Sequence, residues 1–132
     1  RLALNISQSR ATQITRSVAC YQGAGLQHAA FACQDLPGLL DKQPLADSLS
    51  LPVPANYYDD LLARFGGPEQ VALMQRQQIL YDRDAAGGEF LHRYTWPFSE
   101  GRFFFELTER RHGYTQYGAV NAAVRLSAMQ YR

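Results

Sequence analysis

Apolar and polar residues alternate along some stretches of the chain and recur at helical spacing along others, which predicts a mixture of strands and helices. Three apolar-rich runs near the C-terminal end are separated by turn-forming residues, so they predict an antiparallel series of strands. The expected strands cover residues 2–4, 26–33, 77–82, 89–95 and 102–109, with a short extended piece at 49–53. The expected helices cover residues 11–21, 36–40, 56–65, 68–76 and 117–130.

Residues that commonly begin and end helices support these boundaries. Ser7 or Ser9 can cap the first helix, Asp35 the second and Asn56 the third, because a short side-chain oxygen accepts from a free amide of the first turn. Gly66, followed by a second glycine, is expected to end the third helix. The last helix has a weaker pattern. It is expected to bury four side chains in part: Val120, Val124, Leu126 and Met129.

The order of elements predicts an α+β fold with two parts. Residues 1–25 are interpreted as the end of a preceding module, a strand followed by a helix. Residues 26–132 are interpreted as a module of their own with a C-terminal helix. The sequence starts at Arg1 and enters an apolar stretch at once, so we expect it to be the downstream piece of a longer protein.

Composition limits the classes of function. The chain has 132 residues, 46% of them hydrophobic, and a formal net charge of +1, so it offers no field for nucleic acid or acidic membranes. No apolar stretch reaches the roughly 18 residues of a membrane helix, and no secretory signal is apparent. We therefore expect a cytoplasmic protein that binds neither nucleic acid nor membranes.

Two side chains stand out because they are polar residues on apolar strands. His28 lies in the stretch 25–31 and Glu106 in the stretch 101–107. Burying such groups is costly unless they are paired, so they are either metal ligands or a satisfied polar pair. Strand alternation puts Glu106 on the same face as Phe104 and Thr108. His92 has three interpretations: a polar group near a metal, a substrate contact, or a histidine on a half-exposed strand.

Three segments carry a resemblance to a known family. They are residues 23–28 (GAGLQH), 56–61 (NYYDDL) and 103–110 (FFFELTER), with Gly118 and Asn121 beyond them. In this order they resemble the C-terminal half of 4-hydroxyphenylpyruvate dioxygenase, and also the dioxygenase-like domain fused to bacterial 3-dehydroshikimate dehydratase. The stretches 79–84 and 118–121 favour the fused group. The resemblance implies the vicinal-oxygen-chelate superfamily, whose βαβββ modules form curved half-barrels around a metal.

The resemblance also implies a metal centre. His28 is similar to one histidine ligand of the family and Glu106 to its glutamate, while the other histidine lies in the family upstream of the position of Arg1. The implied metal is Fe(II), although another divalent metal suits the same ligands. The positions implied to contact substrate are Asn5, Gln13, Gln27, His92 and Asn121.

Two positions depart from the family and change what it implies. His92 replaces a pocket glutamine, and Ala122 replaces a large aromatic residue. As part of a longer chain, the domain is expected to be a non-haem iron oxygenase that takes an aromatic 2-oxo acid and dioxygen, and it can form homo-oligomers. The alternative, which the two departures favour, is a non-oxygenase domain that binds a metal or ligand and supports a 3-dehydroshikimate dehydratase.

Overall fold

The computed structural model describes residues 2–46, 48–98 and 103–129. In chain order its elements are α1 (Gln13–Tyr21), β1 (His28–Ala32), α2 (Leu36–Lys42), α3 (Ala55–Phe65), α4 (Pro68–Arg76), β2 (Leu80–Arg83), β3 (Glu89–Tyr94), β4 (Phe104–Arg111), η1 (Ala119–Asn121) and α5 (Ala122–Ala128). None of the helices in these ranges is long and apolar enough to cross a membrane.

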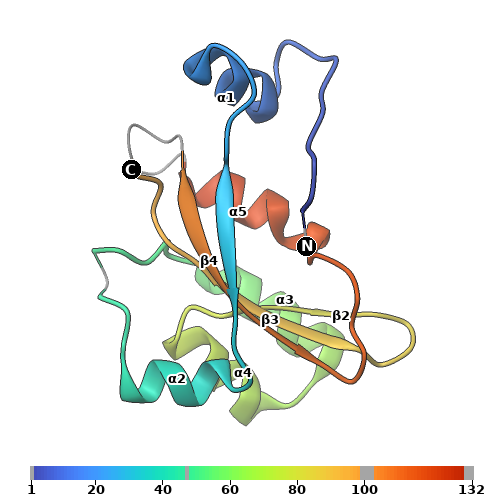
Figure 1. The fold of residues 1–132 in the computed structure, drawn as a ribbon. Helices are drawn as coiled ribbons and strands as arrows, with labels where there is room; N and C mark the ends of the chain where they lie inside the picture. The colour runs from blue at the N-terminus through green and yellow to red at the C-terminus, as the bar shows by residue number, and fades with distance from the viewer. Residues whose placement is uncertain (1, 47, 99–102, 130–132) are drawn as a thin grey trace.

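The four strands form one open sheet in the order β1-β4-β3-β2. The last three strands are antiparallel neighbours, as the sequence predicts, whereas β1 pairs in parallel with β4. Two parallel strands need a long connection. Between β1 and β4 the chain passes through the helices α2, α3 and α4 and then through β2 and β3. The α+β architecture predicted from the sequence is confirmed, with β1, the helices and the hairpin series in the βαβββ order (Figure 1).

The helix starts agree with the sequence in one case and differ in two. Asp35 caps α2, and its Oδ1 accepts from the Gly38 amide at 3.0 Å. Thr12, rather than Ser7 or Ser9, caps α1 through its side-chain oxygen. The third helix begins one residue earlier than expected because Pro54, with φ −65°, holds the extended cap position, which leaves Asn56 inside the first turn.

The hydrophobic core joins the sheet to the helices α2, α3 and α4. Its largest fully buried side chains include Tyr58 and Leu61 from α3 and Leu36 from α2. The C-terminal helix contributes less than the sequence suggests. Val124 and Met129 pack in part against the core, as expected, and Leu126 is 37% exposed. Val120 is 59% exposed and Ala128 is buried instead, because the 3-10 turn η1 before α5 changes which face of the helix meets the core.

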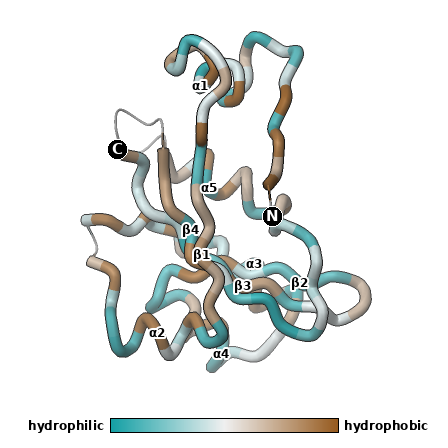
Figure 2. Tube along the Cα trace, viewed as in Figure 1, coloured by the Kyte–Doolittle hydropathy of each residue, from teal (hydrophilic) through white to brown (hydrophobic). Residues whose placement is uncertain are grey.

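The opening segment differs from the prediction. Residues 2–9 form no strand, and their apolar side chains point to solvent: Leu2, Leu4 and Ile6 are 84%, 79% and 84% exposed. The reason is that no described strand lies beside them to accept their backbone hydrogen bonds. In Figure 2 the segment runs from the N-terminus towards α1 at the end of the molecule opposite α2 and α4.

Candidate metal centre

The two residues singled out on apolar strands meet on the sheet. His28 begins β1 and is paired with Phe104 of the parallel neighbour β4, so Glu106, two residues further along β4, shares its face. The His28 Nε2 and Glu106 Oε2 atoms are 3.5 Å apart. Histidine nitrogen and carboxylate oxygen each bind divalent metals at about 2 Å, so adjacent ligands of one ion lie about 3 Å apart. The pair therefore fits a shared cation.

Glu106 uses its other oxygen for a second histidine. His92 lies on β3 next to β4 and is completely buried, and its Nδ1 is 2.7 Å from Glu106 Oε1. Burial of Glu106 by itself would raise the pKa of the carboxyl, but the hydrogen bonds from His28 and His92 outweigh burial and lower the pKa to about 2. The carboxyl is therefore ionised at neutral pH, with one oxygen towards each imidazole.

A polar network continues behind His92. The Asn121 side-chain amide is 2.9 Å from His92 Nε2, and its nitrogen donates to the Tyr81 carbonyl at 3.1 Å. The Tyr57 hydroxyl lies 3.1 Å from Asn121 Oδ1 and accepts from the Tyr81 amide at 2.8 Å. Both Asn121 and His92 are buried, so each finds its partners within the protein. The pKa of Tyr57 is raised to about 12, chiefly by burial.

A glycine lets the C-terminal segment approach this network. Gly118 has a φ of +61°, and a Cβ at this position would lie 2.7 Å from the Phe90 ring and 3.2 Å from His92 Nε2. Both the left-handed backbone and the short approach exclude a larger side chain. Gly118 thus allows η1 to bring Asn121 against His92.

Aromatic rings border the two candidate ligands. Phe104 stacks on His28 with ring centroids 4.9 Å apart and planes 6° apart. The Arg125 guanidinium from α5 lies 4.6 Å from the centre of the Phe104 ring and 5.6 Å from that of Tyr94. Burial lowers the pKa of Arg125. The site therefore combines a carboxylate, two imidazoles and an aromatic wall with a cation at its edge.

The remaining predicted site residues lie outside this cluster of contacts. Asn5 is exposed in the opening segment. The Gln13 side-chain nitrogen is 3.9 Å from Sδ of Met129, which follows α5, and its Oε1 is buried with no hydrogen-bond partner in the part of the chain that the structure describes. The main-chain carbonyl of Gln27 accepts from the Phe104 amide. Within the described ranges, no group of three or more His, Cys, Asp or Glu side chains is arranged to hold a metal.

Sequence reasoning missed Tyr57 and Arg125. Helical spacing from Leu61 indicates that Tyr58 packs in the core, as it does, but the same pattern gives no partner for Tyr57, whose hydroxyl reaches Asn121. Arg125 follows Asn121 by four residues, a spacing that places both on one side of a helix. That spacing is the signal that would have indicated Arg125.

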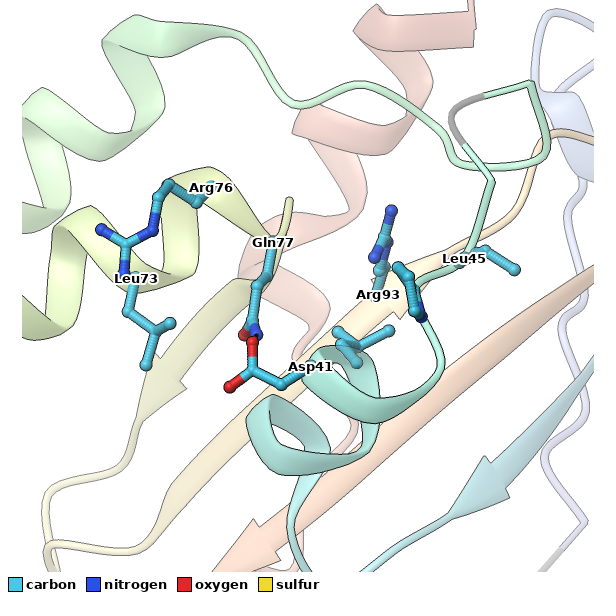
Figure 3. Close-up of a pocket in the computed structure, with 8 residues that line it drawn as sticks. Asp41, Leu45, Leu73, Arg76, Gln77 and Arg93 are labelled. Carbon is cyan, nitrogen blue, oxygen red and sulfur yellow. Dashed lines mark hydrogen bonds between the residues drawn. The ribbon is translucent and has the colours of Figure 1, made fainter.

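A separate pocket of about 320 Å³ lies beside α2 and α4 (Figure 3). Arg93 lines it, and Arg93 alternates with His92 along β3, so the pocket is on the other face of the sheet from the candidate metal centre. Several of its polar groups are engaged inside the protein. Gln77 donates to Asp41 at 2.7 Å, and Arg93 donates to Ser50 at 2.7 Å. None of the candidate site residues lines this pocket.

Comparison with proteins of known sequence reveals clear relatives. The chain is 49% identical over 130 residues to a 3-dehydroshikimate dehydratase of Pseudomonas aeruginosa and 48% identical over 130 residues to that of Pseudomonas putida, covering 98% of this chain and 20% of each relative. It is 33% identical over 81 residues to a probable 4-hydroxyphenylpyruvate dioxygenase 2 of Aspergillus fumigatus, covering 58% of this chain and 20% of that protein. The chain thus spans about a fifth of the length of these curated relatives. No protein-family model matches it.

Solved structures point the same way. A xylose isomerase-like TIM barrel/4-hydroxyphenylpyruvate dioxygenase fusion protein matches 97% of this chain and 21% of its own, with a TM-score of 0.79 and 47% identity. A mutant of 4-hydroxymandelate synthase from Streptomyces coelicolor matches 88% of this chain and 33% of its own, with a TM-score of 0.72 and 27% identity. The chain therefore belongs to the 4-hydroxyphenylpyruvate-dioxygenase-like domains of the vicinal-oxygen-chelate superfamily, of the kind fused to bacterial 3-dehydroshikimate dehydratases.

Proposed function

We propose that this chain is the downstream part of a non-haem Fe(II) oxygenase domain that acts on an aromatic 2-oxo acid. His28 and Glu106 provide two of the three protein ligands, and the third comes from a segment upstream of residue 1. The observation that carries the proposal is the 3.5 Å approach of His28 Nε2 to Glu106 Oε2 from neighbouring parallel strands. When bound, a metal held by three protein ligands supplies open positions for a 2-oxo acid and dioxygen.

The side chains around the pair suit this task. Glu106 is ionised, so it offers a negative charge to a cation without first losing a proton. The Phe104 ring, stacked on His28, fixes the imidazole plane and offers an apolar surface to an aromatic substrate. The buried oxygen of Gln13 has no hydrogen-bond partner among the described residues and can accept from a ligand. Asn5 and Gln27 stay proposed as substrate contacts.

The metal assignment is tested by metal content. We expect His28→Ala and Glu106→Ala, in the full-length protein, each to lose the metal of this site while the sheet stays folded, because neither side chain belongs to the hydrophobic core cluster. Tyr58→Phe is the matched control, since the Tyr58 hydroxyl on α3 is buried and makes no hydrogen bond with any residue in the ranges 2–46, 48–98 and 103–129. Equal metal content in the wild type and both alanine variants would remove the assignment.

A second candidate has support of its own. The two relatives that match almost the whole chain are named for dehydration of 3-dehydroshikimate. The completely buried His92 stands where the family resemblance implies a pocket glutamine. In this alternative the full-length protein is a 3-dehydroshikimate dehydratase. The metal site of this domain then stabilises the protein or binds a small acid, and it does not activate dioxygen.

Two assays on the full-length protein separate the candidates. One measures oxygen uptake with 4-hydroxyphenylpyruvate and other aryl 2-oxo acids, and the other measures dehydration of 3-dehydroshikimate. The oxygenase proposal expects uptake that Glu106→Ala abolishes while dehydration continues. Iron-loaded protein that consumes no oxygen with any of these acids, and loses dehydration in Glu106→Ala, would favour the second candidate and contradict the first.

A further inference from the structure

The donors and acceptors in the hydrogen bonds that link Asn121, His92 and Glu106 can be assigned by starting from Asn121. The Asn121 side-chain atom 3.1 Å from the Tyr81 carbonyl oxygen must be the amide nitrogen, because a carbonyl only accepts. The same nitrogen is 2.9 Å from His92 Nε2. An amide nitrogen carries two hydrogens, so it serves both acceptors. His92 Nε2 is therefore an acceptor and carries no proton.

The hydrogen bond to Glu106 follows from this assignment. A neutral imidazole carries one ring proton, so with Nε2 accepting from Asn121 the proton lies on Nδ1, which is 2.7 Å from Glu106 Oε1 and donates to it. Rotating the Asn121 amide by half a turn would place its oxygen against the Tyr81 carbonyl and remove the donor to His92. Tyr57 agrees as well. Its hydroxyl accepts from the Tyr81 amide, and its single hydrogen has two acceptors within reach, the Tyr81 carbonyl at 3.0 Å and the Asn121 oxygen at 3.1 Å, which is compatible with this arrangement.

We infer that Asn121 holds His92 as the neutral Nδ1–H tautomer, and that His92 thereby occupies Glu106 Oε1 and reserves Oε2, the oxygen nearest His28, for a cation. The inference rests on the metal centre proposed above and adds a role to it. His92 and Asn121 are positioning residues, since they act through Glu106. The hydrogen-bonding groups of His92 and Asn121 are engaged with other groups of the protein, which distinguishes these two residues from substrate contacts.

This arrangement has a consequence for how the carboxylate binds. A glutamate with both oxygens free can bind a cation through both oxygens, or through either one in turn. Oε1 is held by a buried donor and the Tyr94 hydroxyl is also hydrogen-bonded to the carboxylate, so Glu106 is fixed in one orientation with Oε2 nearest His28. Partners that orient a ligand in this manner typically change metal affinity by about 10- to 100-fold when removed.

The test is a Co²⁺ titration of the metal-free, full-length protein, followed by visible absorption. The signal of this site is the part present in the wild type and absent in His28→Ala. We expect His92→Leu, which lacks a donor, to weaken Co²⁺ binding by about 10- to 100-fold and to change the shape of the visible bands. His92→Gln, whose amide can donate to Glu106, should stay within a few-fold of the wild type and keep the band shape. Tyr58→Phe is the control for a change in the buried interior.

The outcomes are separable. Wild-type affinity in His92→Leu, or equal weakening in His92→Leu and His92→Gln, overturns the inference while leaving the metal centre in place. An unchanged signal in His28→Ala overturns the metal centre, and the inference with it. Should His92→Leu fail to fold, Asn121→Ala replaces it. That variant leaves Nε2 without its donor and is expected to weaken Co²⁺ binding several-fold, and wild-type affinity there overturns the inference.

Discussion

The two ends of the molecule use apolar residues in opposite ways. At one end, α2, α3 and α4 bury theirs against the sheet, with Leu36 fully buried and Leu61 1% exposed. At the other end, α1 has no buried residue, and the opening segment exposes Leu4 and Ile6 almost completely (Figures 1 and 2). Both regions have regular apolar patterns. The difference shows that periodicity indicates a local structure, whereas burial requires a second surface.

The acidic residues follow the same division between the two ends of the molecule. Residues 2–27 contain no aspartate or glutamate, whereas the packed part holds Glu106 and Glu109 at 5% and 3% exposure. Glu109 accepts from the Leu36 amide at the start of α2. Carboxylates that are paired inside a fold make it sensitive to acid. The two ends of the molecule are therefore expected to respond differently to truncation, to acid and to removal of a helix cap.

The largest expected difference comes from truncating a leucine at each end. Leu36→Ala should lower the free energy of unfolding of this chain by about 2–5 kcal/mol, since it leaves a cavity in the core. Leu4→Ala should change it by less than about 0.5 kcal/mol, because the side chain is already in water. Urea unfolding of the two variants measures both values. Similar losses would mean that the opening segment packs on the fold.

Acid should destabilise one end only. The folded-state pKa of Glu106 is about 2, below its ordinary value of 4.5. A lowered folded-state pKa means that the stabilisation is present above pH 4.5 and is lost as the pH falls from about 4.5 through about 2. The protection of β3 and β4 amides against hydrogen exchange, relative to the exchange rate of an unfolded chain at the same pH, should therefore fall across this window, with no matching change in α1.

The variant Glu106→Gln provides the control for acid, because it has no carboxyl to protonate at this position. Its β3 and β4 amides should show a shallower dependence on pH than those of the wild type. An equal slope in the two proteins would assign the acid sensitivity to other carboxylates, such as Glu109.

The smallest expected difference concerns the helix caps. Asp35→Ala removes the acceptor for the Gly38 amide and should cost about 1 kcal/mol of global stability, since α2 contributes Leu36 and Leu40 to the core. Thr12→Ala removes the corresponding acceptor at α1, which has no fully buried residue. It should loosen α1 in hydrogen exchange and leave the urea midpoint unchanged. A shifted midpoint in Thr12→Ala would contradict the division into two ends.

Local signals explain why much of the fold was predictable. Asp35 before a proline and an apolar run marks the start of α2, and the glycine pair at 66–67 marks the end of α3. The turn-separated apolar runs after residue 76 gave the hairpin series. The predicted strand at 2–4 failed because a strand needs a neighbour to accept its hydrogen bonds. The expected burial of Val120 failed because a 3-10 turn changes the phase of the last helix.

The sequence by itself determined which side chains were out of place on their strands, His28 and Glu106, because burying a charge in an apolar run is costly wherever the chain folds. It also determined, through resemblance, the family to which the domain belongs. Only the tertiary structure decided that His92 holds one oxygen of Glu106 and that Asn121 and Tyr57 stand behind it. These contacts join residues 14 to 64 positions apart, and hydrogen-bond partners so distant are set by the packing of whole elements, which no local pattern records.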